Sequence, residues 1–335
     1  MTNITKINEI YFKSMSGLMK TGAAEISSFV RSGETPPGPP PVGGDRGLSM
    51  GGYASGDVNT IEYITISTIG NSTNFGDLTN VIEAGAGCSN STNGRGIRAG
   101  NYTAAVNSVI DYIAILTAGD AIDFGDLLIG CGECNATSNG TNERGIIAGG
   151  GTPYSVWHNV IQYITVSTPG NALDFGDLII KRGYTGTSSN GTNDRGIIGG
   201  GVDASTIFNI IEYITISTNS NTTDFGDLTS QRRSMGTSNL TNDRAVFAGD
   251  YPDVNVIDYI TISSNSNAID FGDLTIGRSY GGATSNATNN RGVFMGGYNP
   301  NTNVIDYITI STPGNAQDFG DLSTAVRFNT ACSNG

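Results

Sequence analysis

Charge is scarce in this sequence, and basic residues are scarcer than acidic ones. Charged residues make up 14% of the 335 residues, about half of the ~25% that is typical of soluble proteins. Seventeen basic against thirty acidic residues give a formal net charge of −13. That charge repels phosphate backbones and anionic lipid headgroups. We therefore expect no nucleic-acid partner.

Long apolar runs, cysteine and histidine are also rare. No stretch approaches the ~18 apolar residues of a membrane span, and the start, MTNITKINEIYFKSMSG, lacks the apolar core of a secretion signal. Four cysteines are too few for a disulfide scaffold. The one histidine, His158, has no nucleophile-elbow sequence such as Gly-x-Ser-x-Gly near it. We expect a soluble chain without membrane insertion and without a cleaved signal peptide.

Internal repetition dominates what is present. The string Phe-Gly-Asp-Leu occurs six times, 46 to 51 residues apart, and each copy follows a Tyr by 12 residues. An arginine, followed by Gly or Ala and then by a small-residue pair, marks a third position. The phenylalanines are Phe75, Phe124, Phe175, Phe225, Phe271 and Phe319. The tyrosines are Tyr63, Tyr112, Tyr163, Tyr213, Tyr259 and Tyr307, and the marker arginines are Arg46, Arg95, Arg144, Arg195, Arg244 and Arg291.

Each repeat contains four short segments typical of β-strands. In the third repeat, residues 144–150 and 159–168 are apolar and β-branched, and residues 174–178 and about 179–189 follow after turns. The recurring Ser-Asn-x-Thr-Asn segment is a turn, because Asn and Gly tolerate positive φ and the side chains bond nearby backbone. Four strands in about 49 residues, repeated six times, predict a β-propeller rather than a helical solenoid.

The repeat resembles the kelch repeat in several positions. It keeps an apolar strand that ends in a Gly pair, a Tyr about a dozen residues later and, in four copies, an Arg that the resemblance places in the innermost strand: Arg182, Arg232, Arg278 and Arg327. It has Phe where that family has Trp. The resemblance covers residues 45–335 and implies an all-β, six-bladed kelch-like β-propeller. It says little about activity, because kelch propellers include enzymes and binding modules.

The two ends of the repeat region complete each other. The region begins with the second strand of a blade and stops after a first strand. We predict that residues 323–334 pair beside residues 47–51, so that the N- and C-terminal strands share one blade and no sheet edge stays open at the seam.

A different pattern precedes the repeats. In residues 1–30, apolar residues spaced by three or four predict one or two amphipathic helices, and residues 31–44 are a Pro/Gly-rich linker. One apolar stripe needs a partner. We expect this N-terminal helical anchor to dock on another protein or to self-associate, the alternative being packing on its own propeller. The anchor positions are Ile4, Ile7, Tyr11, Met15 and Leu18.

Cysteines and acids are candidates for metal or catalytic sites. Cys131 and Cys134 form a single Cys-x-x-Cys, and two flanking blades place Cys88 and Cys332 at matching positions of their inner strands. Zinc is one reading, but we expect free thiols because residues three apart on a strand point to opposite faces. Most acids recur blade by blade, as Asp126 does, so we expect structural pairs with marker arginines or turn caps, and neither a cofactor nor a metal. Calcium at the Asp-rich turns is the open alternative.

The loops divide into two kinds. Turns after the first and third strands are short and nearly invariant, whereas the loops after the second strand differ in every blade and carry aromatic residues. Structure alone does not require such differences, and recognition of a glycan or protein does use them. The other reading is ordinary loop divergence. The predicted ligand or partner face consists of Tyr53, Tyr102, Tyr154, Trp157, His158, Phe208, Tyr251 and Tyr298.

We interpret the chain as a non-enzymatic interaction protein. Its YITIST…GNAxDFGDL unit also resembles kelch-type repeats of virion proteins of tailed phages. That resemblance implies a virion-associated structural or adhesion protein, located in the particle, which binds other virion proteins through residues 1–30 and a host-surface glycan or protein through the variable loops. A homo-oligomer through the anchor stays open. The alternatives are a carbohydrate-active propeller enzyme that uses channel or loop carboxylates, and an intracellular adaptor scaffold.

Overall fold

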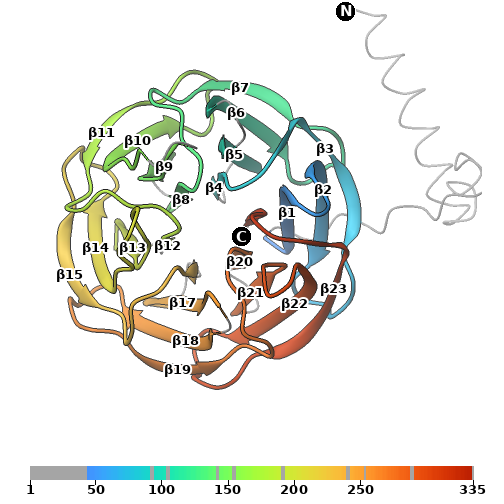
Figure 1. Cartoon of the computed structure of the whole chain (residues 1–335). Coiled ribbons are helices and arrows are strands. Elements are labelled where there is room, and N and C mark those ends of the chain that lie inside the picture. Colours follow the sequence, from blue (N-terminus) through green and yellow to red (C-terminus); the bar gives the residue numbers. More distant parts are fainter. Residues whose placement is uncertain are drawn as a thin grey trace, which may run out of the picture. The chain divides into compact units, whose positions relative to one another are not determined.

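Six four-stranded sheets surround a channel in the computed structural model of the chain (Figure 1). The structure describes residues 44–90, 94–102, 106–140, 143–152, 156–189, 193–238, 242–252, 254–286 and 290–333. Each sheet is antiparallel and forms one blade of a propeller, which confirms the predicted six-bladed, all-β fold. The predicted helical anchor at residues 1–30 and all of the linker except Gly44 lie outside the described residues. Within the described part of the chain, no helix is long and apolar enough to cross a membrane.

Each blade contains four strands, ordered from the channel outward. Blade 1 contains β24 (Thr330–Ser333), β1 (Arg46–Tyr53), β2 (Asp57–Thr65) and β3 (Thr73–Ile82). Blade 2 contains β4 (Ala86–Asn90), β5 (Arg95–Tyr102), β6 (Val106–Ala114) and β7 (Ile122–Asp126). Blade 3 contains β8 (Asn135–Thr137), β9 (Arg144–Ala148), β10 (Val160–Thr165) and β11 (Leu173–Asp177).

The other three blades repeat this order. Blade 4 contains β12 (Gly186–Ser189), β13 (Arg195–Gly199), β14 (Ile210–Thr215) and β15 (Thr223–Asp227). Blade 5 contains β16 (Met235–Ser238), β17 (Arg244–Asp250), β18 (Val254–Thr261) and β19 (Ile269–Asp273). Blade 6 contains β20 (Gly282–Ser285), β21 (Arg291–Met295), β22 (Thr302–Thr309) and β23 (Gln317–Val326).

The ring closes through the last strand, as the sequence predicts. Strand β24 pairs with β1, with Ser333 opposite Gly47 and Thr330 opposite Met50. The closing strand is shorter than predicted, because residues 323–326 continue the outer strand β23. A similar correction applies to the predicted strand at residues 179–189. Only its last four residues form a strand, β12, and residues 179–185 cross from the outer strand of blade 3 to the channel. We call each such crossing segment a connector.

The hydrophobic core lies between the blades. The cluster between blades 3 and 4, for example, combines Ile161, Phe175 and Leu178 with Ile198 and Ile214, all at most 3% exposed. Full burial of one such side chain is worth roughly 1.5–3 kcal/mol. Because each sheet covers the face of its neighbour, a single blade has no core of its own, and the blades depend on one another for stability.

The repeated aromatic and arginine positions form one motif per blade. The marker tyrosine meets the marker phenylalanine edge to face at 5.8–6.2 Å between ring centroids. The marker arginine lies over the tyrosine ring and donates to a carbonyl of the following blade: Arg144 Nη1 bonds Ile216 O at 2.9 Å, and Arg291 Nη1 bonds Ile66 O at 2.8 Å. Of the two alternatives expected for acids of this kind, the ion pair between Asp126 and Arg144 is wrong, because the described residues form their ion pairs elsewhere. The turn cap is confirmed in three blades, where Asp45, Asp194 and Asp243 accept hydrogen bonds from backbone N atoms of the following turn.

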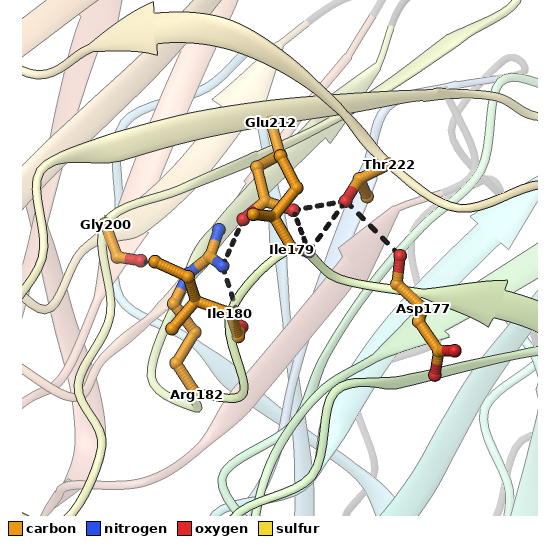
Figure 2. A network of polar contacts seen from close by, with 7 residues as sticks. All are labelled: Asp177, Ile179, Ile180, Arg182, Gly200, Glu212 and Thr222. Carbon is orange, nitrogen blue, oxygen red and sulfur yellow. Dashed lines mark hydrogen bonds and ion pairs between the residues drawn. The ribbon is translucent and has the colours of Figure 1, made fainter.

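Buried charge pairs hold three of the six connectors in place. Arg182, in the connector that enters blade 4, pairs with Glu212 of β14 at 2.5 Å, and both side chains are 0% exposed (Figure 2). Glu212 also accepts hydrogen bonds from Ile179 N and from Thr222 Oγ1 (Figure 2). Arg232 pairs with Asp258 and Arg278 with Asp306 in the same way, each at 2.9 Å. These arginines lie in connectors and not, as predicted, in innermost strands.

Candidate binding face

Two sets of segments share one face of the propeller. The loops after the second strand of each blade lie on the same side as the six connectors, because successive strands of a blade run in opposite directions. We call this side the variable-loop face. The sequence directs attention to the loops alone, whereas the structure shows that the connectors form the centre of this face, around the mouth of the channel.

One connector position recurs around the mouth. It lies nine residues after the Phe of Phe-Gly-Asp-Leu, and five blades place a non-glycine residue there with φ between 53° and 59°. Left-handed backbone costs such residues about 1–2 kcal/mol, and this kind of strain concentrates at functional sites. The five residues are Ala84, Glu133, Tyr184, Tyr280 and Phe328.

Backbone hydrogen bonds link these residues from blade to blade. Tyr184 N donates to Glu133 O at 2.8 Å, Ala84 N to Phe328 O at 2.9 Å, and Phe328 N to Tyr280 O at 2.6 Å. Glu133 N donates to Ala84 O in the same way. The bonds run around the mouth, so they fix the height and direction at which each side chain leaves the backbone.

Three of these side chains form an aromatic cluster. The Tyr184 and Tyr280 rings lie 4.8 Å apart, Tyr280 and Phe328 also 4.8 Å, and Tyr184 and Phe328 6.0 Å. Two loop residues extend the cluster, since Trp157 lies 6.5 Å from Tyr184 and Tyr251 lies 6.4 Å from Tyr280. The aromatic surface therefore runs from the channel mouth out into the variable loops.

Two arginines pack against the rings of this aromatic surface. Arg233 lies over the rings of Tyr251 and Tyr280 and forms an ion pair of 3.7 Å with Asp250. Arg327 lies over Tyr53 and Tyr298 at 4.7 and 4.8 Å from the ring centroids, and over Phe328. Arg327 is thus not the fourth member of the connector arginine series. It lies eight residues after its marker phenylalanine, whereas Arg182, Arg232 and Arg278 lie seven residues after theirs, and it packs against aromatic rings at the mouth.

A carboxyl pair completes the mouth. Glu133 is 7% exposed and accepts a hydrogen bond of 2.5 Å from Tyr184 Oη. Burial raises the pKa of Glu133 to about 7, against the bond from Tyr184, and the neighbouring Glu83 raises it further. Burial, with repulsion from Asp57, also raises the pKa of Glu83 to about 7. Neither acid recurs in the other blades, unlike the aspartates of the repeat.

The structure places the predicted face residues unevenly. Tyr53, Trp157, Tyr251 and Tyr298 lie within the aromatic surface. Burial raises the pKa of Tyr102, and the nearby Glu133 and Glu83 raise it further. His158 and Phe208 lie apart from these contacts, at the start of the third strands, where their carbonyls accept bonds from Arg182 N and Arg232 N. Burial lowers the pKa of His158. Tyr154 lies outside the described residues.

Sequence reasoning missed six connector residues of the mouth: Glu83, Glu133, Tyr184, Arg233, Tyr280 and Phe328. Their identities differ from blade to blade, and apart from Glu133, which lies inside the Cys-x-x-Cys, they belong to no motif. Aligning the six repeats at the ninth residue after the marker phenylalanine finds most of them, because a position that is fixed in backbone and divergent in side chain stands out in such an alignment.

The channel below the mouth is narrow and polar. It is a cavity of about 150 Å³ lined by small residues of the inner strands, with serines and threonines predominant. Cys88 and Cys332 lie on inner strands and Cys131 and Cys134 in a connector, all four free and buried. Burial raises the pKa of Cys88 to about 12. The described residues contain no group of three or more histidines, cysteines or acids that is arranged to hold a metal ion.

The raised pKa of Glu133 predicts how stability changes with pH. The folded protein keeps a proton on this carboxyl up to about pH 7, whereas the unfolded chain releases it near 4.5. The free energy of unfolding therefore falls by up to about 3 kcal/mol as pH rises from 4.5 through 7. Glu133→Gln removes that loss, so the free energy of unfolding of the variant rises relative to that of the wild type as pH rises. Urea denaturation of both at pH 5 and pH 8 checks this, and equal pH slopes would contradict it.

Comparison with known proteins adds no identification. No family model matches the chain, and no curated protein is significantly similar to it.

Proposed function

We propose that the protein is a non-enzymatic, virion-associated binding module whose variable-loop face contacts a host-surface glycan or protein or a neighbouring subunit. One observation carries the proposal. Residues that recur in every blade form the contacts that hold the ring together. Aromatic, acidic and arginine side chains that occur in single blades lie together at one mouth of the channel. A ring held together by repeated contacts does not need this concentration of blade-specific side chains on one face.

The shape of the mouth supports surface contact rather than enclosure. The cavity among Glu133, Tyr184, Arg233, Tyr280 and Phe328 has a volume of about 50 Å³. Pockets that enclose a small ligand measure roughly 300–1,000 Å³. Aromatic rings backed by arginines suit stacking against sugar rings or anchoring of a partner's side chains. The N-terminal segment, residues 1–30, supplies the attachment to the particle in this proposal, on the strength of its apolar spacing and of the resemblance to kelch-type virion proteins.

Binding assays with two single variants test the proposal. We expect Tyr251→Ala and Trp157→Ala each to weaken binding to a glycan array or a host-surface fraction by about tenfold, as expected for hot-spot aromatics. Tyr251 is 46% exposed, so its loss leaves the core intact. Ile269→Ala on the outer strand β19, where the side chain is 59% exposed, is the matched control. Wild-type binding by both face variants would refute recognition through this face.

A carbohydrate-active enzyme is the second candidate, and the Glu83 and Glu133 pair favours it. Glycosidases need one carboxyl with a raised pKa near a second carboxyl, and these acids occur once rather than six times. The small cavity weighs against it. Hydrolysis of aryl glycosides by the wild type, lost in Glu133→Gln, would establish this alternative, and no turnover by the wild type would remove it.

A further inference from the structure

The connectors follow a rule of charge balance at one position. In every blade, the carbonyl of the seventh residue after the marker phenylalanine lies against a positive-φ glycine of the same blade, so these residues are equivalent: Ile82, Cys131, Arg182, Arg232, Arg278 and Val326. The third strand of the blade that each connector enters carries the residue facing it: Asp111, Gln162, Glu212, Asp258, Asp306 and Glu62.

Five blades balance charge at this position. Blades 4, 5 and 6 pair an arginine with an acid. Blade 3 has Cys131 in place of the arginine and a neutral Gln162 in place of the acid, and Gln162 bonds the connector backbone at Ile129. Blade 2 has Ile82 and keeps Asp111, but Arg98, 2% exposed, stands directly opposite Asp111 in the β5–β6 pairing.

Blade 1 breaks the rule. It has Val326 where the arginine would be and retains the acid, Glu62, which is 7% exposed. The four ion pairs of the described residues do not include Glu62. Its carboxyl accepts bonds from Ser72 Oγ at 2.8 Å, from Ser323 N at 3.2 Å and from Ser323 Oγ.

The serine hydroxyl does not replace the arginine. Thr229 and Thr275 occupy the position of Ser323 in blades 5 and 6, and both donate to the acid there through their hydroxyl groups. Those acids bind an arginine as well. The hydroxyl therefore bonds the acid whether or not an arginine is present, and the guanidinium is the group that blade 1 lacks.

A cavity lies where the other blades hold the arginine. It measures about 100 Å³ and is lined by Ser49, Gly51, Val58, Thr60, Glu62, Ser323, Thr324 and Val326. One water needs only roughly 10–15 Å³ of such space. Ser323 and Thr324 at its border are exposed, so the cavity has a route to solvent. The acceptors that hold the other guanidinium groups have counterparts here: Gly51 corresponds to Gly200, which bonds Arg182 Nε, and Ser49 corresponds to Phe294, which bonds Arg278 Nη2.

We propose that the cavity beside Glu62 binds a guanidinium group supplied from outside the described propeller. A buried carboxylate with fixed donors to its other lone pairs favours the planar, forked guanidinium over a compact ammonium. The group comes from an arginine of a partner protein, which takes the place that the chain's own arginine holds in blades 4, 5 and 6. This site is independent of the variable-loop face, so it does not rest on the function proposed above.

Titration with methylguanidinium, followed by saturation-transfer NMR and calorimetry at constant ionic strength, tests the proposal. We expect saturable binding, weaker for methylammonium, that falls at least about tenfold in Glu62→Gln, because a charge-assisted pair is lost. Val326→Arg fills the site from within and abolishes probe binding. Glu62→Gln reproduces the Gln162 of blade 3, so it preserves the fold. Asp270→Asn, at an exposed position of the outer strand β19, is the acid-to-amide control with unchanged binding.

Saturable binding of methylguanidinium by the wild type, lost in Glu62→Gln and in Val326→Arg, supports a site for a partner's arginine. The absence of saturable methylguanidinium binding by the wild type would overturn the proposal. Equal binding by the wild type and Glu62→Gln would overturn it as well.

Discussion

Glu212→Gln lowers the free energy of unfolding by about 3–5 kcal/mol, because it leaves the fully buried guanidinium of Arg182 without its counter-charge. The Arg182 side chain keeps its bonds to Gly200 O and Ile180 O, but neither carries a negative charge. A loss of this size is large beside the 5–15 kcal/mol that folded domains typically have in total. Urea denaturation monitored by tryptophan fluorescence and by circular dichroism measures it.

A double variant supplies the matched control. Arg182→Cys with Glu212→Gln reproduces the Cys131 and Gln162 of blade 3, so it removes both charges in a way the fold already accommodates. We expect it to recover most of the stability that the single variant loses, since desolvation offsets much of the attraction in a buried pair. A double variant as unstable as Glu212→Gln alone would show that the loss comes from packing and not from the unpaired charge.

Gly249→Ala destabilises the protein by roughly 2–5 kcal/mol, from left-handed strain and overpacking together. Gly249 has φ 75°, and a Cβ atom placed on it would lie 2.1 Å from Arg278 O in the next connector. The backbone of the connector has to move away, and the Arg278–Asp306 pair moves with it. Thermal and urea denaturation both report the change.

Gly170→Ala is the control for this substitution. It lies in the turn between β10 and β11, and a Cβ atom on it would meet no atom within 4 Å. We expect a change within about 0.5 kcal/mol, as for most surface substitutions. Equal losses of stability in the two variants would show that the close approach of the Arg278 carbonyl is not the reason why Gly249 is needed.

The sequence predicts the ring because the same strand-forming segments and marker residues recur six times. A marker Tyr, a marker Phe and a marker Arg at constant spacing are enough to define the blade, and the incomplete ends define the closure. The connector is the part of the blade that the sequence predicts wrongly. Residues 179–185 are continuous with β12 in composition, so nothing local distinguishes a strand along the channel from a chain that crosses the blade to reach it.

The candidate site could be predicted only in part, for a related reason. Tyr53, Trp157, Tyr251 and Tyr298 belong to loops whose variability is visible, so the sequence identifies them as a face. Glu133 and Tyr280 owe their place to a backbone position with positive φ, and the sequence does not display φ. The partner of Arg182 is likewise hidden, because the charge pair spans 30 residues and two different elements.

The pairing of β24 with β1 bears on how the protein is made. Strand β1 leaves the ribosome before the other five blades, and its inner edge acquires a partner only after β24 has been translated. Until then a nascent chain carries an unsatisfied strand edge, and chaperones or a second copy of β24 from another chain compete for it. Removal of β24 thus leaves the other five sheets with all their strands and still prevents closure of the ring.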